Sequence, residues 1–269
     1  MIATALDGFV IDLDGTVFRG DQIIEGAPEA IAALRKAGKR LVFLSNRGNI
    51  SRAMCRERLS RYGIAASLDE IVLSSTVTAR YLCKHAPDCQ VWTLGDPGLR
   101  EELESFDIVH AEQPEDADWL VITLHETLTY KDLNDAFRAV THGARIIATN
   151  ADRSFPGITG NQIDVAGMIG AITASTGAEV ELVVGKPSSL MAEEALSALG
   201  LSANQCLVIG DSMESDIGLG KSAGMKTALV LTGSTVQAPA GLWPARPDWV
   251  WPSIAELASI ARDKGEGTV

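Results

Sequence analysis

A short apolar run near the N-terminus, over residues 6–11, constrains the fold of this chain more than any other segment. Its concentration of aliphatic and aromatic side chains predicts a buried parallel strand. The run ends in Asp12-Leu13-Asp14, and Gly15 follows. Because side chains alternate along a strand, we expect the two carboxylates on the same side of the chain, and Gly15 permits a sharp turn after them. Ligands of α/β proteins bind at this end of parallel strands.

The two carboxylates predict a bound divalent cation. Without one, Asp12 and Asp14 would repel each other, and one of them would stay protonated. Mg²⁺ takes oxygen ligands of this kind and removes the repulsion. The plain alternative is a solvated Asp-Gly turn, so the prediction needs further polar groups at the same edge of the sheet.

Strand-like and helix-like segments alternate along the chain. Apolar runs that predict strands lie at 41–44, 70–73, 90–94, 119–124, 144–148, 182–185, 206–211 and 227–231. Segments that predict helices lie at 27–38, 51–62, 97–105, 130–141, 164–175, 189–199, 213–223 and 253–262. This alternation predicts an α/β fold built on a doubly wound parallel sheet. We expect a core made of residues 1–77 and 183–269, with residues 78–182 inserted as an α/β domain of their own.

Composition disfavours several classes of partner. A net charge of −12 argues against nucleic acid and anionic membranes. No apolar segment approaches the roughly 18 residues of a membrane span, and acids interrupt the first apolar run, so we expect no signal peptide. The cysteines form no Cys-x-x-Cys pair and predict free thiols in a reducing cytoplasm; they are Cys55, Cys83, Cys89 and Cys206.

Predicted strands outside the insert end in polar side chains, and these ends predict one site. The polar residues are Asp12 and Asp14, Ser45 and Asn46, Lys186, and Asp211 with Asp216 nearby. Because the carboxyl ends of parallel strands converge on one edge of a sheet, these groups are expected to lie together. Carboxylates suit Mg²⁺, whereas a lysine and a hydroxyl suit a tetrahedral dianion. Each signal alone has an ordinary structural explanation, and their conjunction carries the prediction.

The order of these signals resembles the haloacid dehalogenase-like (HAD) phosphatases. Within them it is similar to the class IIA group with an inserted C2-type cap, which includes p-nitrophenyl, nucleotide, pyridoxal-phosphate and glycerol-phosphate phosphatases. Residues 12–16 look like motif I, Ser45-Asn46 like motif II, 185–187 like motif III and 210–217 like motif IV. The insert is similar at 74–82, 128–133 and 148–152, so the resemblance covers nearly the whole chain.

The resemblance implies a Rossmann-like core and a role for each matching position. Asp12 would be the nucleophile and Asp14 the general acid and base. Mg²⁺ would be held by Asp12, the backbone carbonyl of Asp14 and Asp211, with Asp216 orienting the groups around them. The residues implied to bind the phosphoryl group are Ser45, Asn46 and Lys186. Further substrate-binding positions are Thr16, Arg47, Asn150, Asp152, Phe155 and Ser212.

The implied function is Mg²⁺-dependent hydrolysis of small phosphomonoesters through an aspartyl-phosphate. Nucleotide, sugar, glycerol and pyridoxal phosphates are all candidates, with p-nitrophenyl phosphate as an artificial substrate. A carboxylate nucleophile splits hydrolysis into two displacements, and a second acid protonates the leaving oxygen and then activates water. A dehalogenase would not need Asp14. The expected partner is a small phosphorylated metabolite, and a homodimer formed through the insert is compatible with the resemblance.

Departures from the family pattern leave the substrate open. Residues 159–162 read Thr-Gly-Asn-Gln where the family commonly has Pro-Gly-x-Gly. Arg47 replaces a second asparagine, and either reaches another anionic group or is an exposed loop residue. Phe155 stands where some members have histidine, and either stacks on a ring or packs in the cap. Asp164 either contacts a polyol hydroxyl or favours a helix N-terminus.

Two alternatives to hydrolysis stay open on the same fold. One is a phosphometabolite-binding regulator without turnover, and the other is a phosphotransferase. A P-loop is excluded, because the Gly-Lys-Ser at 220–222 lies inside a predicted helix and lacks the earlier glycine. Lys221 is therefore expected to be a solvated lysine.

Overall fold

The computed structural model describes residues 6–157, 160–238 and 245–258. The chain divides into two compact units, each with its own sheet. The first unit comprises Met1–Ser45, Arg56–Val72 and Met191–Val269, and the second comprises Asn46–Cys55 and Leu73–Leu190. Within the described ranges, no helix combines the length and the apolar character needed to cross a membrane.

The first unit contains a six-stranded sheet in the order β15-β14-β13-β1-β4-β5. The strands are β1 (Gly8–Asp12), β4 (Arg40–Ser45), β5 (Ile71–Leu73), β13 (Cys206–Gly210), β14 (Lys226–Val230) and β15 (Trp249–Trp251). Strand β1 pairs in parallel with both β4 and β13. Numbered along the chain, the strands run 3-2-1-4-5-6 from β5 to β15, so the order reverses between β1 and β13. The doubly wound prediction is therefore confirmed.

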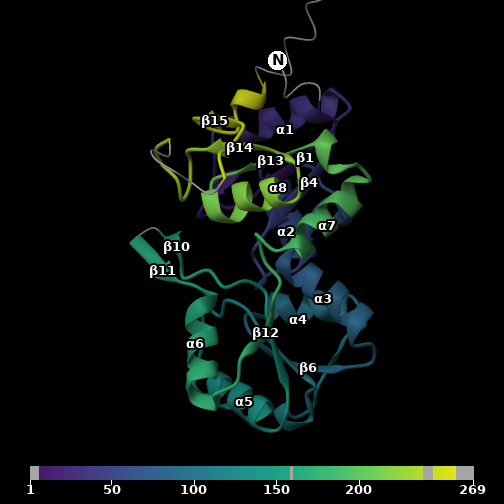
Figure 1. The fold of residues 1–269 in the computed structure, drawn as a ribbon, viewed down its shortest axis with the longest axis vertical. Helices are drawn as coiled ribbons and strands as arrows, with labels where there is room; N and C mark the ends of the chain where they lie inside the picture. The colour runs from purple at the N-terminus through teal and green to yellow at the C-terminus, as the bar shows by residue number, and fades with distance from the viewer. Residues whose placement is uncertain (1–5, 158–159, 239–244, 259–269) are drawn as a thin grey trace, which may run out of the picture. The chain divides into compact units, whose positions relative to one another are not determined.

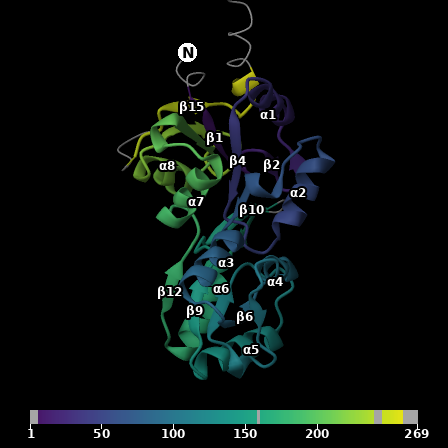
Figure 2. The ribbon, with the colours of Figure 1, turned by 90° about the vertical axis from the view of Figure 1, so that its right-hand side faces the viewer.

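Helices cover both faces of this sheet. They are α1 (Ala27–Lys36), α2 (Arg52–Arg61), α7 (Ser189–Leu199) and α8 (Gly218–Ser222). Figure 2 shows α1 and α2 on one side of β1 and β4, and α7 and α8 on the other. Helix α1 begins with Pro28 in its first turn and is followed by Gly38 at φ 71°, a left-handed conformation that glycine adopts without strain. A short hairpin, β2 (Phe18–Arg19) and β3 (Gln22–Ile23), follows β1.

The C-terminal part of the first unit differs from the sequence-based expectation in two places. The predicted helix at 213–223 is a π-helical turn, η5 (Met213–Ile217), followed by α8. The tail contributes β15, which pairs in parallel with β14, although the sequence pattern indicates no strand there. Prolines at 247 and 252 bracket this three-residue strand and hide its apolar pattern. The predicted last helix, 253–262, extends beyond the described residues.

The second unit contains a five-stranded parallel sheet in the order β12-β9-β8-β6-β7. The strands are β6 (Gln90–Leu94), β7 (Val109–His110), β8 (Trp119–Ile122), β9 (Arg145–Ala148) and β12 (Val180–Val183). The helices are α3 (Ser74–His85), α4 (Pro97–Glu104), α5 (Tyr130–Thr141) and α6 (Val165–Thr176), as Figure 1 shows. The strand order reverses between β6 and β8. An antiparallel hairpin, β10 (Ser154–Gly157) and β11 (Gly160–Ile163), is an addition that the sequence pattern does not indicate.

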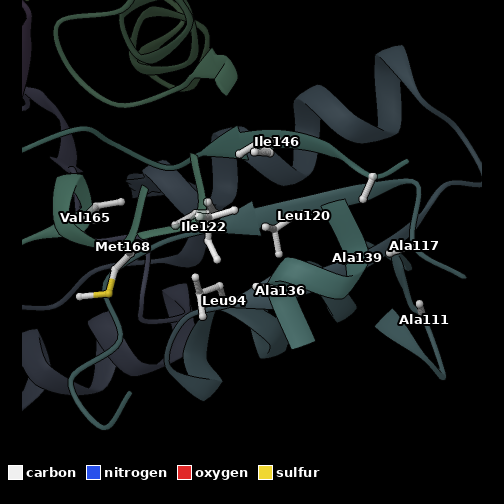
Figure 3. Close-up of a cluster of buried hydrophobic side chains, with 12 residues drawn as sticks. Leu94, Ala111, Ala117, Leu120, Ile122, Ala136, Ala139, Ile146, Val165 and Met168 are labelled. Atoms are coloured by element: carbon white, nitrogen blue, oxygen red, sulfur yellow. The ribbon is translucent and has the colours of Figure 1, made fainter. Parts of the chain in front are cut away.

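The core of the second unit packs small helical residues against branched strand residues. Ala136 and Ala139 of α5 belong to the same cluster as Leu120 and Ile146 of β8 and β9, and Met168 of α6 joins it (Figure 3). Alanine lets a helix approach a sheet closely, and the branched side chains fill the remaining space. The core therefore fixes the strand ends that carry polar residues.

Candidate functional site

Three buried carboxylates gather at the carboxyl ends of β1 and β13. Asp12 is the last residue of β1, Asp211 follows β13, and Asp216 lies in η5. Each offers a carboxylate oxygen, and these oxygens lie within 4.8 Å of one another. The sheet reverses its strand order between β1 and β13, which is where doubly wound sheets bind their ligands.

Backbone donors and a glycine hold two of these carboxylates in place. Asp216 Oδ2 accepts a hydrogen bond of 3.0 Å from the Ser212 N–H, and Asp211 Oδ2 accepts one from the Ser234 N–H. A β-carbon on Gly210 would overlap the Asp216 side chain, so glycine is required at the end of β13. The turn through η5 therefore returns Asp216 against the strand end that carries Asp211.

The three carboxylates fit a hard divalent cation. Asp12, Asp211 and Asp216 are 5%, 4% and 1% exposed, and like charges this close and this buried favour a bound cation over mutual repulsion. An all-oxygen donor set suits Mg²⁺ or Ca²⁺. The carboxylate of Asp216, which the resemblance assigns to orienting the groups around the cation, lies in the same group.

The side chain of Asp14 faces helix α2. Arg58 Nη1 lies 3.5 Å from Asp14 Oδ1, and 36% of the Asp14 side chain is exposed. The Arg58 guanidinium also lies 4.1 Å from the centre of the Phe18 ring and donates to the carbonyl of Gly20. Arg58 therefore links Asp14 to the β2–β3 hairpin. Nothing in the sequence indicates this role, because α2 carries several arginines and any of them could simply be exposed to solvent.

The residues predicted to bind the phosphoryl group fall in both units. Ser45 ends β4 in the first unit and is buried, one residue beyond the register partner of Asp12. Asn46 and Lys186 belong to the second unit, where they are hydrogen-bonded to each other. Lys186 is buried, with 7% of the residue exposed, although a lysine before a proline is usually a surface charge.

Predicted substrate-binding residues in the second unit lie after β9. Asn150 is buried, and its Nδ2 donates to Asp152 Oδ2 at 2.8 Å. Phe155 is half-buried in the β10–β11 hairpin, and Arg47 is half-buried in the loop after β4. Asp164 caps helix α6, since its Oδ1 accepts a hydrogen bond of 2.7 Å from the Val165 N–H.

Two further predicted contacts, Thr16 and Ser212, lie in the first unit. Thr16 is fully buried, and its hydroxyl has no hydrogen-bond partner within the described part of the chain. Ser212 Oγ accepts a hydrogen bond of 3.1 Å from the Ser215 N–H and so caps η5. Both side chains therefore sit within the turns that shape the carboxylate group.

A second polar cluster lies at the reversal point of the second sheet, after β6 and β8. His125 Nδ1 is 3.2 Å from Asp96 Oδ1, and His125 Nε2 is 3.5 Å from Asp132 Oδ2. Asn49 Nδ2 donates to Asp96 Oδ2 at 2.9 Å. Burial raises the pKa of Asp132, but hydrogen bonds from Thr129 and the nearby His125 outweigh it and leave the pKa below its usual value. His125 therefore lies between two carboxylates.

Two family models and a similar protein from Bacillus subtilis match this sequence. A family model described as haloacid dehalogenase-like hydrolase matches residues 9–109, and a HAD-hydrolase-like model matches residues 183–257. The sugar-phosphatase AraL of Bacillus subtilis (strain 168) is 60% identical over 256 residues, covering 95% of this chain and 93% of that protein.

Solved structures agree with these matches. A p-nitrophenyl phosphatase from Archaeoglobus fulgidus has a TM-score of 0.86 and 34% identity, over 95% of this chain and 99% of that one. A glycerol phosphate phosphatase from Mycobacterium tuberculosis, solved in complex with calcium, has a TM-score of 0.84 and 29% identity, over 95% of this chain and 76% of that one.

Proposed function

We propose that this chain, which belongs to the haloacid dehalogenase-like hydrolases, hydrolyses small phosphomonoesters with the help of Mg²⁺. The phosphatase names of its relatives support the reaction class. The observation that carries the proposal is the group of three buried carboxylates at the strand-order reversal of the first sheet.

Two aspartates divide the proposed chemistry between them. A carboxylate oxygen of Asp12 attacks phosphorus, the bond from phosphorus to the ester oxygen breaks, and an aspartyl-phosphate forms. Asp14 gives its proton to the departing oxygen, and then takes a proton from the water that attacks phosphorus. That attack frees the Asp12 carboxylate and releases inorganic phosphate. The 36% exposure of the Asp14 side chain suits a group that exchanges protons with substrate and water.

The negatively charged phosphoryl oxygens require positive charge and hydrogen-bond donors around them. Asp12 and Asp211, with the backbone carbonyl of Asp14, would hold the cation, and Asp216 adds negative charge beside them. When bound, Mg²⁺ supplies positive charge for the phosphoryl oxygens. We assign phosphoryl binding to Ser45 and Lys186, because a hydroxyl and an ammonium donate well to a dianion.

Sugar phosphates are the proposed substrate class. The 60% identity to a sugar-phosphatase over nearly the whole chain supports this choice over nucleotides or pyridoxal phosphate. We further propose that the second unit serves as a C2-type cap that limits access to small metabolites. All four cysteines are free thiols, which supports a reducing, cytoplasmic setting.

Phosphate release from a panel of sugar, nucleotide, glycerol and p-nitrophenyl phosphates tests the proposal. Wild-type protein should release phosphate with Mg²⁺ and lose that activity in EDTA, and Asp12→Asn should be inactive. Asp69→Asn is the matched control, since it removes an exposed carboxylate outside the site.

Other outcomes identify the alternatives. Activity retained in Asp12→Asn would rule out Asp12 as the nucleophile. Wild-type protein that binds phosphate esters without turnover would be a regulator. Labelled phosphate that reaches a second alcohol instead of water would indicate a phosphotransferase.

A further inference from the structure

The loop that follows β4 lies along the carboxyl edge of the second sheet. A β-carbon on Gly48 would lie 2.6 Å from the hydroxyl of Thr123, which follows β8, and would also overlap Thr149, which follows β9. Asn49 donates to Asp96, which follows β6. The loop therefore passes against the ends of three neighbouring strands, and at Gly48 the approach leaves no room for a β-carbon.

This edge is the place where an open parallel sheet usually binds a ligand. In the second unit, the reversal point between β6 and β8 is lined by Asp96 and His125, and Asn49 is bonded into it. The loop after β4 thus takes the position that a ligand takes in other sheets. We therefore interpret the edge of the second sheet as a surface that holds this loop in place.

The amide of Asn46 is committed to protein partners at both ends. Its Oδ1 accepts a hydrogen bond of 2.7 Å from the Lys186 N–H. Its Nδ2 donates to Asp152 Oδ2 at 3.0 Å and lies 3.3 Å from the Lys186 carbonyl. A β-carbon on Gly185 would come within 2.9 Å of Asn46 Oδ1. The side chain of Asn46 therefore grips the backbone of Lys186 and leaves no polar atom for a phosphate.

Asp152 fixes the direction of this amide. An ionised carboxylate only accepts hydrogen bonds, and Asp152 Oδ2 receives one from Asn46 and one from Asn150. If the Asn46 amide rotated by half a turn, its oxygen would face the Asp152 carboxylate and its NH₂ would face the Lys186 N–H. Both contacts would be repulsive, so Asp152 and the Lys186 backbone together select this orientation of the Asn46 amide.

We infer that Asp152 is a positioning residue for the phosphate-binding lysine, acting through Asn46. The inference rests on the proposed function, because it takes Lys186 as the group that binds the phosphoryl oxygens. It replaces the expectation that Asn46 and Asp152 bind substrate with their side chains. The phosphoryl group is common to all substrates, so disturbing the hydrogen bonds among Asp152, Asn46 and Lys186 should affect every substrate equally.

A charge-swap series tests the inference. Asn46→Asp places a second carboxylate beside Asp152 and should lower kcat/KM and the affinity for inorganic phosphate roughly ten- to a hundredfold. Adding Asp152→Asn offers an amide donor to the new carboxylate, so the double variant should recover part of that loss, although the same amide then also meets the Asn150 NH₂. Asp152→Asn alone should cost less than about threefold, because its amide oxygen still accepts from Asn46. Each constant is measured with a sugar phosphate, with p-nitrophenyl phosphate and with inorganic phosphate as inhibitor.

The outcomes separate this inference from the proposed function. A wild-type protein without phosphatase activity would overturn the proposed function itself. An active wild type whose double variant is no better than Asn46→Asp would overturn the positioning role. If Asn46→Asp fails to fold, Asp152→Ala decides instead: an equal loss on both substrates and on phosphate inhibition supports the inference, and a loss confined to the sugar phosphate contradicts it.

Discussion

Gly15 and Asp211 approach each other so closely that a β-carbon on Gly15 would lie 2.5 Å from the carboxyl carbon of Asp211. Gly15 also has φ 91°, a conformation that other residues adopt only with strain. The turn after β1 thus needs glycine twice, once for its backbone and once for space beside the carboxylate group.

Gly15→Ala is expected to damage the site more than the fold. The strained backbone conformation alone should cost about 1–3 kcal/mol of unfolding free energy. Displacement of Asp211 should remove most of the phosphatase activity. Gly38→Ala is the matched control, since Gly38 has φ 71° and a β-carbon there would meet no described side chain within 4 Å. Urea unfolding and phosphate release are measured on both variants, and equal activity in the two would contradict the steric argument.

Arg58→Met is expected to lower kcat about tenfold and the free energy of unfolding by about 1–2 kcal/mol. The substitution removes the 3.5 Å contact with Asp14 and the stacking on Phe18, and a charged or stacked contact of this kind contributes about 1–2 kcal/mol. Arg61→Met, on the same helix and paired with Glu57 at the surface, is the control. Steady-state kinetics that leave both variants at wild-type rates would remove Arg58 from the site.

The stability contribution of Asp248 should depend on pH. Burial raises the pKa of Asp248, but hydrogen bonds from Lys221, Lys226 and the Thr227 N–H hold it well below its ordinary value of 3.8. Lys221 is therefore an ion-pair partner, although the sequence suggested a solvated lysine. Because the folded pKa is depressed, the contribution is complete above pH 3.8 and is lost as the pH falls through the folded pKa.

Asp248→Asn should accordingly destabilise the protein by about 1.5–3 kcal/mol at pH 7. The difference from wild type should shrink when urea unfolding is repeated near pH 3, where the unfolded carboxyl binds a proton. Asp69→Asn changes the net charge equally at an exposed position and should show no such trend. A difference that stays constant with pH would exclude ionisation of Asp248 as its cause.

The cysteines should differ sharply in reactivity. Burial raises the pKa of the Cys206 thiol to about 11, and the thiolate is the species that reacts. Iodoacetamide at pH 8 should therefore modify the exposed Cys83 and spare the buried Cys206 and Cys55 in the folded protein. Peptide mass spectrometry measures each site, and all of them should react in urea. Rapid labelling of folded Cys206 would contradict its burial.

Sequence reasoning predicts the parallel sheets because buried parallel strands form continuous apolar runs and helices between them form amphipathic ones. It misses β15 and the β10–β11 hairpin for a shared reason. Each of these strands is three or four residues long and lacks an apolar run with its own turn signals. Pairing with a neighbouring strand stabilises them, and that pairing is a tertiary property.

The sequence predicts those residues of the candidate site that stand at the ends of buried strands. Asp12 and Asp211 can be brought together because both end buried strands. The hydrogen-bond partners of Asn46 cannot be predicted in this way, because Lys186 lies 140 residues away and an asparagine in a loop has many possible partners nearby in the sequence. Arg58 is hidden in the same way, because only the folded hairpin brings Phe18 beneath its guanidinium.

Helix α2 begins in a segment that packs with the second unit and ends in the first. Its N-terminus is tied down by Glu102, which accepts hydrogen bonds from the backbone N–H and the guanidinium of Arg52. Replacing the second unit, the proposed cap, with that of another phosphatase therefore requires two segments of the chain to be exchanged. Asn46–Cys55 would have to be exchanged together with Leu73–Leu190, because a foreign second unit would lack the contacts of the native loop. Lys186 would then lose its support from Asn46, even though Asp12 and Asp14 remained in place.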